Sequence, residues 1–115
     1  MPARVMRIAD APTYNPPLHT LVDAKRLQGL EAGPTEAFWM GLSYYAPGAT
    51  VDPSETAAEC VYFIVSGELV VTVDGSEQTL RAGDSIHFTK GTLRSVANRS
   101  DQTTQLLVTI ALPKG

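Results

Sequence analysis

The chain is poor in the residues that staple small proteins or bind metals. Its 115 residues include one cysteine, Cys60, and two histidines, His19 and His87. A single cysteine excludes an internal disulfide and a cysteine-rich zinc site. The histidines are far apart in sequence and form neither an H-x-H nor an H-x-x-x-H pair. The sequence therefore contains no two-histidine metal motif.

Long apolar runs and concentrated positive charge are missing as well. No stretch of about 18 apolar residues exists, and the N-terminus lacks the charged-then-apolar layout of a signal peptide. The formal net charge is -3, and the nine basic residues are scattered. Binding of nucleic acid needs a concentrated cationic face. We therefore expect a cytoplasmic protein whose partners include neither nucleic acid nor a membrane.

The N-terminal part of the chain predicts an arm followed by one domain. Prolines keep residues 1–20 out of helix and central sheet, so we expect an extended arm there. Residues 21–115 are enough for a single barrel domain with one core. Residues 21–27 could form a helix, but an edge strand over residues 25–30 is favoured because the run is short for a helix.

Beyond Pro34 the signals are those of β-structure. Strands are predicted at residues 37–45, 60–65, 68–73 and 78–80, on both sides of a turn at 89–91, and at 105–112. Residues 49–58 are predicted to form a polar loop, and the apolar run 60–65 to be buried on both faces. Asp74-Gly75 is the strongest hairpin signal, since both residues accept a positive φ. About eight short strands without a convincing helix indicate an all-β sandwich or barrel.

Between residues 48 and 98 the chain matches two spaced patterns. Gly48 and Gly67 fit the two ends of G-x5-H-x-H-x3-E-x6-G. Gly83, Gly91 and Asn98 fit G-x5-P-x-G-x2-H-x3-N. In these motifs the chain resembles the cupin superfamily. The resemblance implies a double-stranded β-helix of the jelly-roll type, a cupin barrel to which the N-terminal extended arm is attached.

The same two patterns locate the metal ligands of the family. In cupins the two histidines and the glutamate of the first pattern, with the histidine of the second, hold a divalent transition metal. Carried over by position, these places are occupied by Ser54, Thr56, Cys60 and Arg94. None of the first three is a strong ligand in this company, and a guanidinium cannot coordinate a metal. We therefore expect no metal and no other cofactor.

Acidic residues near Cys60 offer an alternative metal site. Asp52, Glu55, Glu59 and Cys60 could form an improvised ligand set. On a strand, Glu59 and Cys60 point to opposite faces, so at most one of them faces the pocket. Without imidazole pairs such a site is not favoured.

Arg94 is the residue on which we expect the function to depend. In the cupin register it projects into the barrel beside Cys60 and Tyr62. A buried guanidinium needs a partner, which could be the carboxylate or phosphate of a ligand bound in bidentate fashion. An internal ion pair with one of the acidic residues named above is the structural alternative. We predict a small anionic organic ligand in contact with Arg94, Ser54, Thr56 and Cys60.

Two classes of function remain open at this point. The first is a binding or sensory module that holds the anionic molecule. The second is a metal-independent isomerase, epimerase or lyase acting on a sugar-like or carboxylate substrate, in which Cys60 or Tyr62 moves a proton. Cys60 would then need a lowered pKa; otherwise both residues are part of the core. Some cupins of the epimerase type work without metal. The absent histidines count against a third reading, a metal-dependent dioxygenase or decarboxylase.

The histidines and the outer surface carry weaker predictions. His87 alternates with Ile86 and Phe88 and is expected to be structural or interfacial. His19 could reach the pocket mouth only if the arm folds over it. Small barrels leave sheet edges and apolar outer faces, so we expect a homodimer.

Overall fold

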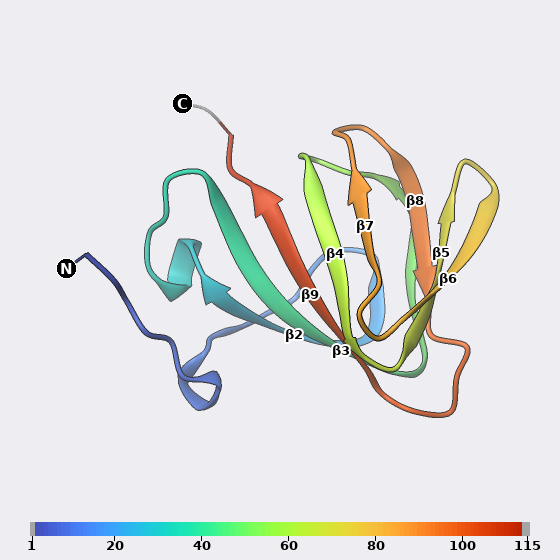
Figure 1. The fold of residues 1–115 in the computed structure, drawn as a ribbon, viewed down its shortest axis with the longest axis horizontal. Helices are drawn as coiled ribbons and strands as arrows, with labels where there is room; N and C mark the ends of the chain where they lie inside the picture. Colours follow the sequence, from blue (N-terminus) through green and yellow to red (C-terminus); the bar gives the residue numbers. More distant parts are fainter. Residues whose placement is uncertain (1, 114–115) are drawn as a thin grey trace.

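The computed structural model describes residues 2–113 and shows an antiparallel β-barrel (Figure 1). The strands are β1 (Thr13–Tyr14), β2 (His19–Gln28), β3 (Phe38–Glu55), β4 (Cys60–Ser66), β5 (Glu68–Val73), β6 (Ser76–Arg81), β7 (Ser85–Phe88), β8 (Leu93–Ala97) and β9 (Thr104–Ala111). Two short 3-10 turns, η1 (Ile8–Asp10) and η2 (Leu30–Ala32), are the helical segments of this part of the chain, and neither could cross a membrane. The all-β jelly-roll barrel with an extended N-terminal arm is confirmed.

The long strand β3 joins the two halves of the barrel. The strand order is β6-β5-β8-β3-β9-β4-β7, with β2 beside β3 and β1 beside β2. Residues 38–45 of β3 pair with β9, whereas residues 50–55 pair with β8. Between them, residues 46–49 bulge out of the ladder with β2, and Gly48 there has φ 84°. Such bulges bend a strand, which lets β3 pass from one sheet to the other.

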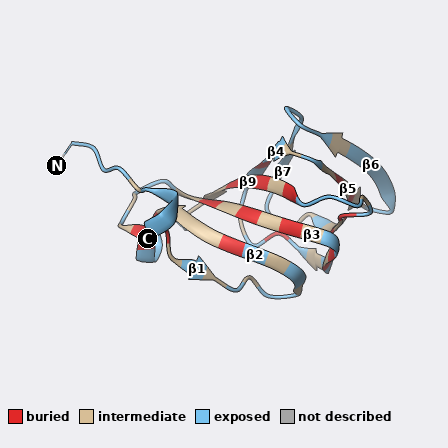
Figure 2. Cartoon of the chain, turned by 90° about the horizontal axis from the view of Figure 1, so that it is seen from below, coloured by how far each residue is buried: buried red, intermediate tan, exposed pale blue. Residues whose placement is uncertain are grey.

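Two predictions about local structure are wrong. The polar loop expected at residues 49–58 is strand as far as Glu55, because β8 supplies a distant pairing partner. The run 60–65 is buried on one face only: Cys60 is 5% exposed, but Val61 is 39% exposed. The same one-sided burial is visible along β3 in Figure 2. Apolar character on the outer face of β4 does not require that face to be covered.

The N-terminal segment is bound to the barrel by strand pairing. The strand expected at residues 25–30 is confirmed as far as Gln28, where β2 ends, whereas Leu30 begins η2; the helical alternative for residues 21–27 is wrong. The expected boundary between residues 20 and 21 lies within β2. β1 pairs with β2 through Thr13 opposite Lys25 and Tyr14 opposite Ala24. This pairing carries the arm toward one end of the barrel.

The stretch around the turn at residues 89–91 crosses between the sheets. β7 pairs with β4, whereas β8 pairs with β5 and β3, so the two strands flanking the turn do not pair with each other. Arg94 of β8 stands directly opposite Ser54 of β3. Cys60 of β4 stands opposite Phe88 of β7. The turn therefore places Arg94 and Cys60 on opposite sheets, with the interior between them.

Candidate ligand-binding site

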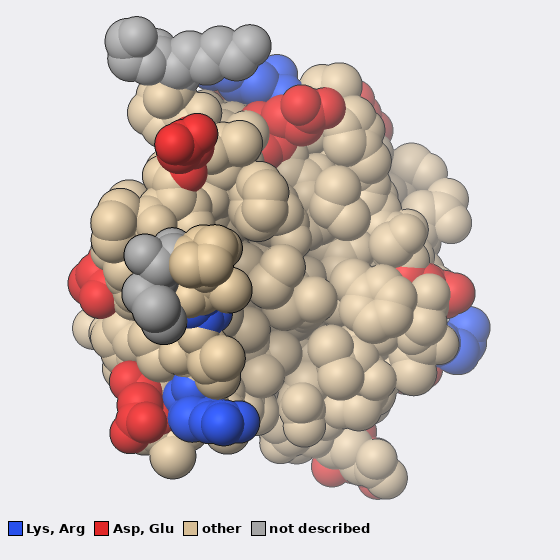
Figure 3. All heavy atoms as spheres, turned by 60° about the vertical axis from the view of Figure 1, so that its left-hand side comes forward, with Lys and Arg blue, Asp and Glu red and all other residues tan. Residues whose placement is uncertain are grey.

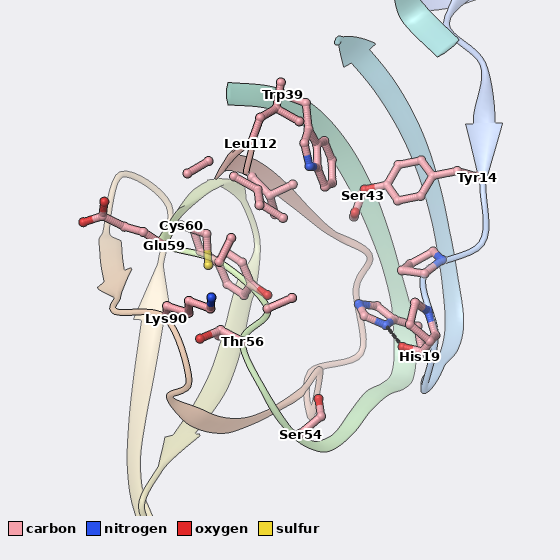
Figure 4. A pocket seen from close by; sticks show the side chains of 18 of the residues that line it. Tyr14, His19, Trp39, Ser43, Ser54, Thr56, Glu59, Cys60, Lys90 and Leu112 are labelled. Atoms are coloured by element: carbon pink, nitrogen blue, oxygen red, sulfur yellow. Dashed lines mark hydrogen bonds between the residues drawn. The ribbon is translucent and has the colours of Figure 1, made fainter. Parts of the chain in front are cut away.

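The barrel contains a cavity of about 950 Å³ that is partly open to solvent. Its walls come from the arm, β2, β3, β4, β8, β9 and the residues after β9. In Figure 4, His19 of β2, Trp39 and Ser54 from the two halves of β3, and Cys60 of β4 surround this space. The volume is typical of small-molecule sites. All of the predicted site residues line the cavity: Ser54, Thr56, Cys60, Tyr62 and Arg94.

Arg94 brings an unpaired cation to the cavity. Its Nη1 donates a hydrogen bond to Ser54 Oγ at 2.6 Å. Its Nε is buried and has no hydrogen-bond partner in the part of the chain that the structure describes. The ion pairs found among residues 2–113 do not include Arg94, so the internal ion pair considered as the structural alternative is not formed. The guanidinium therefore retains donor capacity that a ligand can use.

Tyr62 and Thr56 contribute differently to the wall. Burial raises the pKa of Tyr62, an effect that the neighbouring Arg94 opposes, so at neutral pH the side chain is a phenol that can donate a hydrogen bond. Thr56 Oγ1 donates to the Thr89 carbonyl at 2.7 Å and accepts the Thr92 N–H at 3.0 Å. The hydroxyl of Thr56 thus secures the turn between β7 and β8.

The Cys60 thiol differs from expectation. Burial raises its pKa, and the opposing effect of Arg94 is smaller. A nucleophilic or acid-base role would need a lowered pKa, and the structure gives this thiol a raised one. A thiol that stays protonated behaves as a small apolar group in the cavity wall.

We expect Cys60 to react slowly with iodoacetamide between pH 7 and 8. The thiolate is the reacting species, and burial keeps its fraction below that of free cysteine. Alkylation is measured by mass spectrometry in native buffer. Protein unfolded in about 8 M urea is the control. Native alkylation as fast as that in urea would contradict this account.

The residues at the family's metal positions do not fit a metal. Among residues 2–113, no three His, Cys, Asp or Glu side chains come together where they could hold a metal ion. The improvised set around Cys60 is not assembled either, because the Glu59 carboxylate instead lies 2.7 Å from His87 Nε2, within hydrogen-bond distance. Both side chains of this pair are more than half exposed. His87 therefore lies on the surface, outside the set of residues that line the cavity.

The sequence did not identify one wall of the cavity as functional. The Arg26 guanidinium lies 3.8 Å from the centre of the Tyr14 ring and 4.2 Å from that of Trp39. It also forms an ion pair with Glu31 at 2.9 Å. The two rings meet edge to face at 5.6 Å. These contacts join β1, β2 and β3, and they hold Trp39 against the cavity.

His19 also lines the cavity, so the arm does fold over its mouth. Tyr14, Pro16 and Pro17 follow the same path along the rim. The run of prolines was the only sequence signal for this arrangement. It indicated an extended arm, but it could not indicate where the arm would lie.

The chain belongs to the cupin family, since residues 41–110 match the family described as Cupin domain. The beta-D-galactosidase Rv1717 of Mycobacterium tuberculosis is 53% identical to it over 110 residues, which are 96% of this chain and 95% of that protein. The resemblance drawn from the two glycine-rich patterns is thus confirmed.

Solved structures share the fold at low identity. The polyketide cyclase RemF from Streptomyces resistomycificus has a TM-score of 0.82 at 15% identity. The match covers 95% of this chain and 79% of the RemF chain. A predicted oxalate decarboxylase from Thermotoga maritima has a TM-score of 0.79 at 23% identity. The match covers 96% of this chain and 100% of the decarboxylase chain. At these identities the comparison concerns the fold alone.

Proposed function

We propose that this cupin binds a small organic anion in its barrel, with Arg94 receiving the anionic group in place of the family's metal. The observation that carries the proposal is the buried Nε of Arg94, which has no partner among residues 2–113, in a side chain that makes no carboxylate contact within the same part of the chain. Leaving a buried donor unsatisfied is unfavourable. A carboxylate or phosphate that accepts two parallel hydrogen bonds from the guanidinium relieves this cost.

The remaining walls indicate the other part of the ligand. Trp39, Val108, Ile110 and Leu112 line the cavity with apolar surface. The face drawn in Figure 3 is likewise formed mainly by uncharged residues, with most charged side chains toward its edges. A ligand with one anionic group and one apolar face fits this division. A planar ring or the apolar face of a sugar ring satisfies the second requirement.

Matched pairs of ligands test the proposal. Benzoate and benzamide share a ring and differ in charge, as do D-galacturonate and D-galactose. We expect each acid that binds to do so at least about tenfold more tightly than its neutral partner, or about 1.4 kcal/mol. Trp39 is the only tryptophan, so its fluorescence reports binding at the cavity. Equal affinities within both pairs would contradict an anion site.

Hydrolysis of a β-galactoside is a second candidate, supported by the name of the 53% identical relative. Glycosidases generally use two carboxyl groups that flank the scissile bond. The acidic residues lining the cavity are Glu55 and Glu59, both exposed, and Glu59 is paired with His87. Turnover of nitrophenyl β-D-galactoside that is lost in Glu55→Gln or Glu59→Gln would favour the hydrolase. Absence of turnover in the wild type would leave the binding function.

The homodimer stays a prediction. Val61, Phe63 and Val65 are exposed on the outer face of β4, where a second copy of the chain would cover them. Apolar outer strands of this kind are common at dimer interfaces. The cavity described above is formed within one chain.

A further inference from the structure

His19 presents an unprotonated nitrogen to the cavity. Its Nδ1 lies 2.7 Å from the Pro17 carbonyl oxygen, which can only accept a hydrogen bond. Nδ1 therefore carries the proton, and in the neutral ring Nε2 carries the lone pair. None of the hydrogen bonds formed by residues 2–113 uses Nε2. In Figure 4 the ring nitrogen that is not engaged with Pro17 faces the cavity.

The backbone around His19 is held in an unusual conformation. Leu18 and Leu21 have positive φ values of 63° and 59°, which side chains with a Cβ rarely adopt. Their own side chains are 53% and 61% exposed, so burial does not explain the conformation. The Leu18 carbonyl accepts the Asp52 N–H at 3.0 Å, and this bond holds the segment to β3. Strain of this kind tends to occur at functional sites.

The surroundings of His19 keep its ring neutral. Burial lowers the pKa of His19, the hydrogen bond to the Pro17 carbonyl opposes this effect, and the Arg94 charge lowers the pKa further. The ring of Tyr45 lies 6.3 Å away, and burial raises the pKa of that phenol, so it is uncharged. Val51, opposite His19 on β3, is apolar. At neutral pH the imidazole is therefore in its basic form.

We propose that His19 acts as a general base, removing a proton from a carbon next to the carboxylate or keto group of a ligand held by Arg94. The inference rests on the proposed anion site. The C–H bond breaks, its electron pair moves onto the oxygen held by the guanidinium, and the proton goes to Nε2. Return of the proton to the same carbon restores the acid or inverts its centre, and return to another carbon isomerises it. The base of the isomerase or epimerase reading is then His19 rather than Cys60.

Deuterium exchange tests the role of His19. Pyruvate, phenylpyruvate and D-galacturonate are incubated with the protein in D₂O, and loss of the proton next to the keto or carboxylate group is followed by NMR. We expect the wild type to accelerate exchange of at least one acid that binds. The rate should rise with pH as His19 loses its proton, with a midpoint below the ordinary pKa of histidine. His19→Gln should slow this exchange about 100-fold. Its affinity for the acid, from Trp39 fluorescence, should change little.

His87→Gln is the matched control, since the same substitution then falls on the exposed histidine paired with Glu59. It should exchange deuterium at the wild-type rate. Exchange by His19→Gln as fast as by the wild type would overturn the inference, and so would binding of the acids without exchange. If none of the acids binds, the anion site itself fails and this inference fails with it.

A titration without ligand examines the same group. In ¹⁵N-histidine-labelled His87→Gln protein, the remaining imidazole is that of His19. At pH 7 its spectrum should be that of the neutral ring protonated on Nδ1, and Arg94→Met should raise its pKa. An imidazolium, or a ring protonated on Nε2, would overturn the assignment.

Discussion

Replacing Arg94 with methionine should weaken binding of an organic acid by about 100-fold or more. The same substitution should leave the ligand-free protein as stable as the wild type, or more stable. The loss of affinity follows from removing a cation that forms charge-assisted hydrogen bonds in a partly buried site. The stability is kept because Nε has no partner to lose within the described residues, and because Ser54 Oγ and the neighbouring Tyr62 phenol can be solvated from the cavity once the guanidinium is gone.

The combination of the two effects distinguishes a binding residue from a structural one. Breaking a buried ion pair by removing one partner costs about 3–5 kcal/mol. Arg26→Met is the matched control, because Arg26 is similarly enclosed but stacks on two rings and pairs with Glu31. Urea denaturation should show a clear loss of stability for Arg26→Met and none for Arg94→Met. A large loss of stability for Arg94→Met would show that Arg94 has a structural role rather than a binding role.

Arg94→Lys separates charge from geometry. Lysine keeps the positive charge but cannot form two parallel hydrogen bonds to one carboxylate. We expect its affinity for the acid to lie between those of Arg94→Met and the wild type. Full retention of affinity would mean that the site recognises charge alone.

Asn98→Ala should lower the free energy of unfolding by about 3 kcal/mol. Asn98 is 1% exposed, and its Nδ2 donates to the carbonyls of Tyr45, Ala46 and Gln102 at 2.9, 3.3 and 2.8 Å. Its Oδ1 accepts the N–H of Ser100 at 3.1 Å. Alanine would leave these groups without partners in the interior. The bulge of β3 and the turn before β9 would lose their shared anchor.

Urea denaturation measures this effect. Arg99→Ala, at the next position but on an exposed side chain paired with Glu77, is the control and should change stability little. A loss below about 1 kcal/mol for Asn98→Ala would show that water replaces the amide without cost. Since domains of this size are stable by only about 5–15 kcal/mol, the expected loss is a large fraction of the total.

The relative placement of the residues from the two cupin patterns was predictable from the sequence, because it depends on their spacing along the chain. Gly48 and Asn98, from the two cupin patterns, meet in space: the Gly48 N–H donates to the Asn98 carbonyl at 3.0 Å. Ser54 and Arg94 fall opposite each other on paired strands. The spacing of the cupin patterns placed Ser54 and Arg94 in one pocket, but the strand pairing that joins them was not predicted, because residues 49–58 were expected to form a loop.

The other half of the site could not be predicted because its contacts join segments that are distant in sequence. Nothing near Arg26 in the sequence indicates that Tyr14 and Trp39 will enclose it. The position of His19 depends on a bend of the arm at two leucines with positive φ, a conformation that their residue type does not suggest. The pKa of Cys60 depends on whether burial or Arg94 has the larger effect, which only the folded arrangement decides.

The most direct test of the account observes the Arg94 Nε–H group by NMR. In ¹⁵N-arginine-labelled protein, the resonance is assigned by its absence from Arg94→Met. We predict that a saturating acid, benzoate or D-galacturonate, moves the Arg94 Nε–H proton downfield and slows its exchange with water, as expected when a carboxylate accepts its hydrogen bond. Benzamide and D-galactose should leave the resonance in place. A resonance that stays unchanged while the acid is bound would contradict the claim that Arg94 receives the anion.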